Sequence, residues 1–297
     1  MELQMEQVVD AILQDYSQQR QIDKLEALRN PDKDAVIDMI EKLRRIVFPG
    51  YFRDKNFRSY ASRNQLSVLI EDTMHCMVKQ IALVYESMGQ AAETAREQAA
   101  VVSVKFFKAI PQVRALVQTD LEAAYAGDPA ATGMAEIIFA YPGLYAITVY
   151  RLAHVLEGLH VPILPRIMTE HAHSVTGIDI HPGAVVGAYF FIDHGTGIVV
   201  GQTTVIGDYV KIYQGVTLGG LSTRGGQSLR GQKRHPTIGD RVTIYANATV
   251  LGGDTVIGND CVIGANSFII QSVPPCTRVS LKNQEVQLQR RSDGCCE

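Results

Sequence analysis

The chain has 297 residues, of which 46% are apolar and 20% charged, and a net charge of −3 at pH 7. This composition is typical of a folded globular protein, and the weak negative charge gives no electrostatic footprint for nucleic acid. The acidic, polar N-terminus is not a signal peptide, and no apolar stretch reaches the roughly 20 residues of a membrane helix. The five cysteines lack the CxxC spacing of a metal site, so we expect reduced thiols in a cytoplasmic protein with no bound metal.

The first part of the chain, residues 1–174, is predicted to be a helical domain. Apolar residues recur at spacings of three and four, the period of an amphipathic helix. NPDKD at 30–34 is a break with a capping signal before the second helix, and GDPAATG at 127–133 is another break. The segments with helical period are 6–16, 34–48, 66–88 and 94–125, and a further helix is expected from about 133 to 158.

From about residue 175 the period changes to six. An aliphatic residue, often followed by glycine, occupies each repeat position, which is the signature of a parallel β-helix shaped as a triangular prism. We therefore predict an α+β fold, with a left-handed parallel β-helix over 175–272 and a C-terminal tail over 273–297. Flat prism faces favour a trimer around a three-fold axis. The repeat positions are 180, 186, 192, 200, 206, 212, 218, 238, 244, 251, 257 and 263, with a two-residue slip before 200 and a one-residue slip before Leu251.

Two ionisable residues stand where the repeat first slips, in FIDHGTG at 191–197. Gly195 and Gly197 allow backbone angles that a regular repeat does not need. With three strands per coil, Asp179 and His194 are expected to flank one corner about one coil apart, near the roughly 5 Å spacing of neighbouring strands. A carboxylate beside an imidazole suits a general base. A turn aspartate and a solvent-exposed histidine fit the same spacing equally well.

Two further segments depart from the repeat. Residues 221–237, LSTRGGQSLRGQKRHPT, form an insertion rich in glycine and basic residues that includes the Arg234–His235 pair. It is either a flexible surface loop or a lid over a substrate whose carboxylate this pair binds. Small residues within 245–247 (Tyr-Ala-Asn) and 264–266 (Gly-Ala-Asn) leave a groove for a long thin ligand, although tight corners alone also require small residues.

Six motifs follow one another along the chain: GDPA (127–130), YRLAH (150–154), DIHPGAVVG (179–187), FIDHGTGIVVG (191–201), VTLGG (216–220) and RHPTIG (234–239). Together they resemble the serine O-acetyltransferase family. The resemblance implies an acyltransferase that moves the acetyl group of acetyl-CoA to L-serine, giving O-acetyl-L-serine and CoA for cysteine biosynthesis. Transfer would be direct, with both substrates bound together, because no Cys or Ser stands beside the base as a covalent carrier.

The resemblance also assigns roles to single residues. His194 would be the general base, and Asp179 would pair with it and orient it. The helical domain would supply oligomer contacts and part of the serine site. Serine would be held by Asp128, Asp193, Arg234 and His235, and coenzyme A would lie along Gly219, Ala246 and Ala265.

The implied partners follow from the same family. They are a homotrimer or a dimer of trimers, and L-cysteine as a feedback inhibitor at the serine site. Gln202 stands where the family usually has glutamate, and the lid insertion is longer than usual. The chain ends in DGCCE, with Cys295 and Cys296, instead of the isoleucine-terminated tail that docks into O-acetylserine sulfhydrylase. We therefore expect no tight complex with that enzyme by this route.

Three other functions stay open from the residues alone. A hexapeptide acyltransferase for another hydroxyl or amine is one, although Asp128 and Arg234–His235 suit a zwitterionic amino acid better than a neutral sugar. A γ-type carbonic anhydrase on the same prism would bind zinc through three histidines, and His181, His194 and His235 are present. A scaffold without activity is the third, and the Asp179–His194 pair argues against it.

Overall fold

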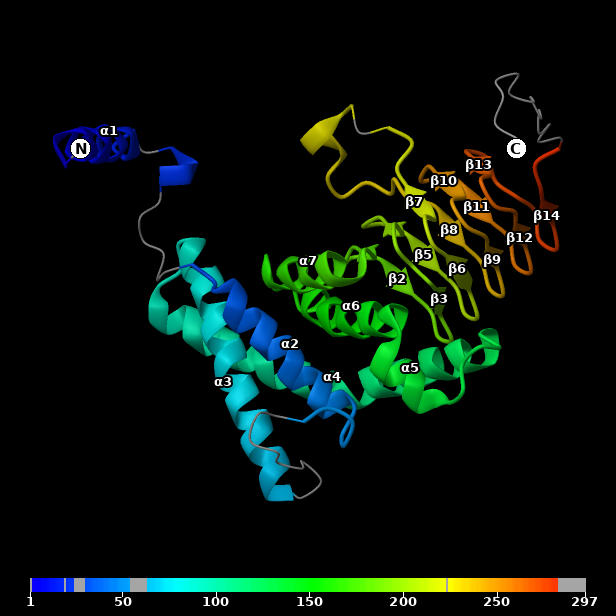
Figure 1. Cartoon of the computed structure of the whole chain (residues 1–297), viewed down its shortest axis with the longest axis horizontal. Helices are drawn as coiled ribbons and strands as arrows, with labels where there is room; N and C mark the ends of the chain where they lie inside the picture. Colours follow the sequence, from blue (N-terminus) through cyan, green and yellow to red (C-terminus); the bar gives the residue numbers. More distant parts are fainter. Residues whose placement is uncertain (1, 19, 24–29, 54–62, 223, 283–297) are drawn as a thin grey trace, which may run out of the picture.

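Helices come first along the chain and strands follow (Figure 1). The computed structural model describes residues 2–18, 20–23, 30–53, 63–222 and 224–282. No helix within these ranges combines the length and the apolar character that crossing a membrane requires. The helices are α1 (Glu2–Tyr16), α2 (Lys33–Val47), α3 (Arg63–Ser87), α4 (Ala92–Gly127), α5 (Met134–Ala140), α6 (Pro142–Gly158) and α7 (Leu164–Thr176).

The capping signal predicted before the second helix is confirmed. The Asp32 side chain accepts hydrogen bonds from the backbone N–H groups of Asp34 and Ala35, at 2.9 and 3.3 Å. These bonds satisfy two of the N–H groups that a helix N-terminus leaves without a partner. The buried face of α2 then follows the three- and four-residue spacing of the sequence, through Val36, Met39, Ile40 and Leu43.

The single helix predicted over 133–158 is wrong, because the chain breaks at Tyr141 between α5 and α6. Pro142 is the first residue of α6, and Tyr141 before it has φ −83° and ψ 118°, which is extended backbone. A proline disfavours helical angles in the residue that precedes it, and it is well tolerated in the first turn of a new helix. The break places the Tyr141 side chain beside the end of α4.

The strands form three parallel sheets that make the faces of a prism, as predicted (Figure 1). Sheet A has the order β1-β4-β7-β10-β13, sheet B β11-β8-β5-β2, and sheet C β14-β12-β9-β6-β3. The strands of sheet A are Asp179–Ile180, Val199–Val200, Thr217–Gly219, Thr249–Leu251 and Phe268–Ile269. Those of sheet B are Val185–Val186 (β2), Val205–Ile206 (β5), Thr237–Ile238 (β8) and Val256–Ile257 (β11), and those of sheet C are Phe191–Asp193 (β3), Lys211–Tyr213 (β6), Thr243–Ile244 (β9), Val262–Ile263 (β12) and Arg278–Val279 (β14).

The repeat positions fill the interior of the prism. In sheet A, Ile180, Val200 and Leu218 stack in register and are at most 2% exposed. Burying each such side chain stabilises the fold by about 1.5–3 kcal/mol. One expected position is wrong: Val250 is fully buried, whereas Leu251 is partly exposed, so the one-residue slip comes after Val250.

A glycine and then an acidic or amide residue often follow the aliphatic position of the repeat, and one contact between neighbouring coils explains both. Asp208 accepts a hydrogen bond from the backbone N–H of Ala188, and Asp240 accepts one from Asp208, at 2.7 and 2.9 Å. Each side chain therefore reaches across to the neighbouring coil. A Cβ atom on Gly207 would overlap the Asp240 side chain, so only glycine leaves room for this contact.

The coils continue beyond residue 272, where the tail was expected to begin. β14 pairs with β12 through Val262 and Arg278, and Val273 forms a bridge with Ile257. These backbone hydrogen bonds extend the prism to Val279. Residues 283–297, including Cys295, Cys296 and the terminal segment on which the sulfhydrylase expectation rests, lie outside the described residues.

The helical part contacts the first coil of the prism, where α4 and α6 pack against β3 and α7 packs against β1. A buried ion pair between Asp120 of α4 and Arg151 of α6 lies at this contact. Arg151 also donates to the carbonyl oxygen of Gly187, and Asp120 accepts from the backbone N–H of Phe190, at 2.7 and 3.0 Å. The helices thereby fix the position of the first coil and of the corner that follows β3.

Candidate functional site

His194 lies on an exposed corner of the prism, between β3 and β4. Its backbone has φ +59°, and Gly195 and Gly197 also have positive φ, in line with the glycines of the sequence motif. The backbone N–H of Gly197 donates to the carbonyl oxygen of Gly177 at 2.8 Å, so this corner stacks on the previous one. The imidazole is 75% exposed, and its Nε2 lies 3.7 Å from Oδ1 of Asp193. A substrate can therefore approach the ring freely.

Asp193 is held by a lysine that the sequence did not single out. Lys211 Nζ lies 3.1 Å from Asp193 Oδ2 and donates to the Gly127 carbonyl oxygen at 2.9 Å. The same ammonium lies over the rings of Phe191 and Tyr213, at 4.6 and 4.7 Å from their centroids. Lys211 thus ties β6 to the end of α4 and fixes the carboxylate beside His194.

Asp128 follows α4 and faces the same corner. Its Oδ2 accepts a hydrogen bond from the Tyr141 hydroxyl at 2.6 Å, and its Oδ1 accepts one from the Ala130 N–H at 2.8 Å. The Tyr141 hydrogen bond, then the Ala130 one and the positive charge of Lys211, lower the pKa of Asp128. The same bond raises the pKa of Tyr141 to about 12, so Tyr141 is a neutral donor. We call Asp128, Tyr141, Asp193, His194 and Lys211 the histidine corner.

Arg234 and His235 lie where the insertion returns to the prism. Thr203 anchors them: its Oγ1 accepts from the Arg234 N–H at 2.9 Å, and its own N–H donates to His235 Nδ1 at 3.1 Å. The His235 ring packs so closely on Gly201 that a Cβ atom there would overlap it. The insertion itself projects from the prism between β7 and β8 and contains a short 3-10 turn, Gly226–Leu229 (Figure 1).

Two histidines beside Arg234 are kept neutral. Burial first, and the charges of Arg234 and Lys233 next, lower the pKa of His235 to about 4. Burial and the charges of nearby arginines lower the pKa of His181 to about 4 as well. His181 Nδ1 accepts the Gly183 N–H at 3.0 Å, as His235 Nδ1 accepts that of Thr203. Each neutral ring therefore carries its proton on Nε2, which is left as a hydrogen-bond donor. We call His181, Gln202, Thr203, Arg234 and His235 the arginine corner.

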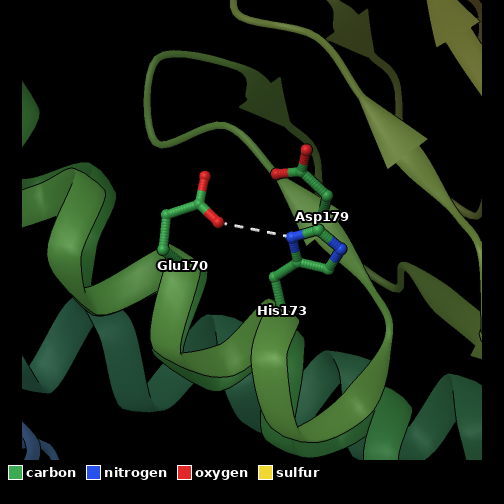
Figure 2. A group of neighbouring side chains, drawn as sticks. All are labelled: Glu170, His173 and Asp179. Atoms are coloured by element: carbon green, nitrogen blue, oxygen red, sulfur yellow. Dashed lines mark hydrogen bonds and ion pairs between the residues drawn. The ribbon is translucent and has the colours of Figure 1, made fainter.

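The Asp179 side chain faces α7, where it pairs with Arg166 and lies beside Glu170 and His173 (Figure 2). Arg166 Nη1 lies 3.5 Å from Asp179 Oδ1, and Arg166 also forms an ion pair with Glu170. His173 Nδ1 lies 3.3 Å from Glu170 Oε2, and the ligand atoms of Glu170, His173 and Asp179 lie within 4.8 Å of one another. Such a group can attract a metal ion, but here the Arg166 guanidinium already forms an ion pair with each of the two carboxylates. The three histidines proposed for zinc do not form a metal-binding group among the residues that the structure describes.

The expected contact between Asp179 and His194 does not form within this chain. Their corners do stack, since Asp179 N–H donates to the Ile198 carbonyl oxygen at 2.9 Å, but no hydrogen bond or ion pair joins the two side chains in the described part of the molecule. Asp179 points outward from β1 toward α7, whereas His194 extends from a left-handed corner position toward Asp193. The spacing of the repeat predicts correctly that the two residues lie on neighbouring coils, but it does not predict the directions in which their side chains point.

The residues predicted to lie along coenzyme A are found on two different edges of the prism. Ala246 and Ala265 lie above His194 on the same edge, where successive corners are linked by backbone hydrogen bonds such as Asn266 N–H to Ala246 O at 2.9 Å. Gly219 lies on the other edge of sheet A, where Gly252 N–H donates to its carbonyl oxygen at 3.1 Å. The histidine corner precedes the strands of sheet A and the arginine corner follows them, so β4 separates the two.

Comparison with known proteins identifies the family. The family model for the bacterial transferase hexapeptide (six repeats) matches residues 235–271. A plasmid-encoded serine acetyltransferase of Synechococcus elongatus is 42% identical over 222 residues, which cover 71% of this chain and 70% of that protein. The crystal structure of serine acetyltransferase isoform 3 of Entamoeba histolytica in complex with cysteine is 37% identical, with a TM-score of 0.72, over 85% of this chain and 84% of that one.

A second solved structure, a serine acetyltransferase in complex with CoA, is 26% identical, with a TM-score of 0.53, over 82% of this chain and 96% of that one. These similarities extend through both the helical part and the prism, and the first relative shares more than two fifths of its aligned residues with this chain. The chain therefore belongs to the serine acetyltransferase family and is an acyltransferase enzyme.

Proposed function

We propose that the protein transfers the acetyl group of acetyl-CoA to the hydroxyl of L-serine, giving O-acetyl-L-serine and CoA as a step of cysteine biosynthesis. Family membership supports this reaction, and so does a relative solved with CoA. The observation that carries the proposal is the pairing of an exposed imidazole with anionic groups at one corner and a guanidinium at the other. A zwitterionic amino acid with a hydroxyl complements this set of charges.

His194 acts as the general base in this proposal. Its Nε2 takes the proton of the serine hydroxyl while the oxygen attacks the thioester carbonyl carbon. The bond to sulfur then breaks, and the departing thiolate takes the proton back from the imidazolium. Asp128 and Asp193 hold the serine ammonium beside the base, and their own anchors, Tyr141 and Lys211, keep the two carboxylates in place.

Two residues of the arginine corner, Arg234 and His235, bind the serine carboxylate. Arg234 offers a guanidinium, and the neutral His235 offers its Nε2–H as a further donor. The small residues Ala246 and Ala265 leave room for the long chain of coenzyme A above His194, and the insertion closes over the substrates as a lid. Holding both substrates together is the larger part of the rate enhancement.

The complete site is formed between two copies of the chain. One chain cannot bring both corners onto one serine, since β4 lies between them. A homotrimer of prisms sets the histidine corner of one copy against the arginine corner and Asp179 of the next. His194 would then meet the Asp179 carboxyl across the interface and be oriented by it.

Other expectations complete the proposal. L-cysteine, which carries the same ammonium and carboxylate, binds at the serine site as a feedback inhibitor, and a relative solved with cysteine supports this. The helical domain contributes oligomer contacts, so that trimers pair into hexamers or remain trimers, and the enzyme is cytoplasmic. We also propose that the helical part, the prism and the C-terminal tail are three separate units of the chain.

Thiol release from acetyl-CoA tests the function. We expect turnover with L-serine and little with homoserine, threonine or a sugar, which separates this activity from that of an acyltransferase for another acceptor. His194→Ala should lower kcat by about 10²–10⁴-fold, the usual contribution of a general base. His75→Ala, at an exposed position of α3, is the matched control. Wild-type rates in His194→Ala, or turnover with a sugar alone, would refute the proposal.

A further inference from the structure

Arg234 is held by a neutral side chain. Its Nη2 donates to Oε1 of Gln202 at 2.6 Å, and its Nη1 lies 3.4 Å from the Leu229 carbonyl oxygen. Gln202 lies two residues after the end of β4 and is half-buried, so the corner itself fixes where its amide can reach. The guanidinium is therefore positioned from the rigid prism rather than from the insertion alone.

No carboxylate forms an ion pair with Arg234 in the part of the chain that the structure describes. Two carboxylates on this side of the prism, those of Glu170 and Asp179, are paired with Arg166. Lys233 adds a second positive charge, and its ammonium is held by the Thr203 carbonyl oxygen at 2.6 Å. His181 and His235 are neutral. The arginine corner thus carries an excess of positive charge.

We propose that Gln202 sets the affinity of the enzyme for carboxylate-bearing ligands, because it positions Arg234 without neutralising it. This inference rests on the proposed function, in which Arg234 binds the carboxylate of L-serine. Gln202 does not touch the substrate and acts through Arg234, so it is a positioning residue. An amide is the one common side chain of this length that offers an acceptor oxygen and no charge.

A glutamate at this position would hold Arg234 in the same geometry with opposite effect. Glutamate is isosteric with glutamine, and a charge-assisted hydrogen bond is roughly twice as strong as a neutral one. The guanidinium would then be satisfied before the substrate arrives. The incoming carboxylate would also face a negative charge one side chain away. Binding of the carboxylate would weaken while the chemistry at His194 would not change.

The experiment compares steady-state kinetics of wild type and Gln202→Glu with L-serine and with L-serinamide, which lacks the carboxylate. We expect KM for L-serine to rise at least about tenfold, equivalent to about 1.4 kcal/mol of binding. We expect kcat, KM for acetyl-CoA and KM for L-serinamide to stay within about twofold of wild type. Gln90→Glu, on the exposed turn between α3 and α4, controls for net charge.

A second variant separates positioning from charge. Gln202→Met keeps the length of the side chain and adds no charge, but it loses the acceptor oxygen, so KM for L-serine should rise less than in Gln202→Glu and no ion pair should form. Thermal melting of each variant reports folding. An unchanged KM for L-serine in Gln202→Glu, or an equal rise for L-serinamide, would overturn the inference. A wild-type enzyme with no turnover on L-serine would instead overturn the proposed function, and calorimetric titration of L-serine into both proteins would still test the role of Gln202.

Discussion

Arg151 Nε lies 2.6 Å from Asp120 Oδ2 in an ion pair whose side chains are 3% and 1% exposed. The pair joins the helical part to the first coil of the prism. Asp120→Asn should therefore destabilise the protein by about 3–5 kcal/mol, because it leaves a buried guanidinium without its counter-charge. Urea unfolding measures the change. Asp260→Asn breaks an exposed Arg241–Asp260 pair and should change stability little. Equal effects of the two substitutions would contradict the role given to the buried pair.

Mixing two inactive variants tests whether the site is shared between chains. Asp179→Asn and His194→Ala should each have little activity as pure oligomers. In mixed oligomers, an intact His194 from one chain meets an intact Asp179 from its neighbour, so thiol release should reappear after co-expression or subunit exchange. A mixture no more active than its parents would show that each site lies within one chain. The double variant mixed with either parent provides the control.

Tyr141→Phe should change the acid side of the pH profile. The Tyr141 hydrogen bond is the largest cause of the lowered pKa of Asp128. Without it, that pKa moves up toward the ordinary value of an aspartate. The carboxylate is then lost at a higher pH as the solution is acidified, so kcat/KM for L-serine should fall earlier than in wild type, within about pH 3 to 6. Tyr125→Phe, on the exposed side of α4, should leave the profile unchanged.

His235 should make the folded state sensitive to acid. Its pKa is about 4 in the folded protein against 6.5 for an ordinary histidine. Between these values the unfolded chain binds a proton that the folded chain does not, so stability is full above pH 6.5 and falls as the pH drops toward 4. His235→Asn retains an acceptor for Thr203 and cannot titrate. Its unfolding midpoint in urea should therefore lose less between neutral and acid pH than that of wild type. An identical loss would contradict the prediction.

Gly201→Ala should displace the His235 imidazole, whose atoms occupy the space of the added methyl group. We expect a rise in KM for L-serine and a loss of about 1–3 kcal/mol, the usual cost of overpacking. Gly133→Ala is the matched control, because a Cβ atom there meets nothing within 4 Å. Its φ of 174° is extended backbone that alanine adopts without strain. A Gly201→Ala enzyme with wild-type KM would show that His235 does not depend on this close contact.

The parts of the fold that a periodic pattern encodes could be predicted from the sequence. A repeat of six places Ile180 and Val200 inside the prism, because each strand has the same relation to the axis. The change of repeat at Val250 was misplaced by one residue because Leu251 is equally aliphatic, and only its exposure separates the two. The helix break before Pro142 could have been predicted, because a proline disfavours helical backbone in the residue before it, but the apolar spacing continues across the break and suggests one helix.

The contacts of the site were harder to predict, since they join segments far apart in sequence. Lys211 and the Gly127 carbonyl oxygen are 84 residues apart, and Lys211 looks like an ordinary outward residue of a strand. Tyr141 lies near Asp128 in sequence, but its contact depends on the helix break between them. The direction of Asp179 depends on Arg166, which comes from a helix that no motif singled out.

Because the first coil packs against α4, α6 and α7, we expect the prism to fold from this end and to open first at the other end. Neighbouring coils bond residues 18 to 20 apart, as Val199 and Thr217 or Ala188 and Asp208 do, and the insertion stretches this separation to 32 for Asp208 and Asp240. Each coil depends on the one before it, so ordering spreads upward from the helices and pauses at the longer loop. Amide hydrogens of the coils after the insertion should therefore exchange first, while those of the coil against the helices should exchange last.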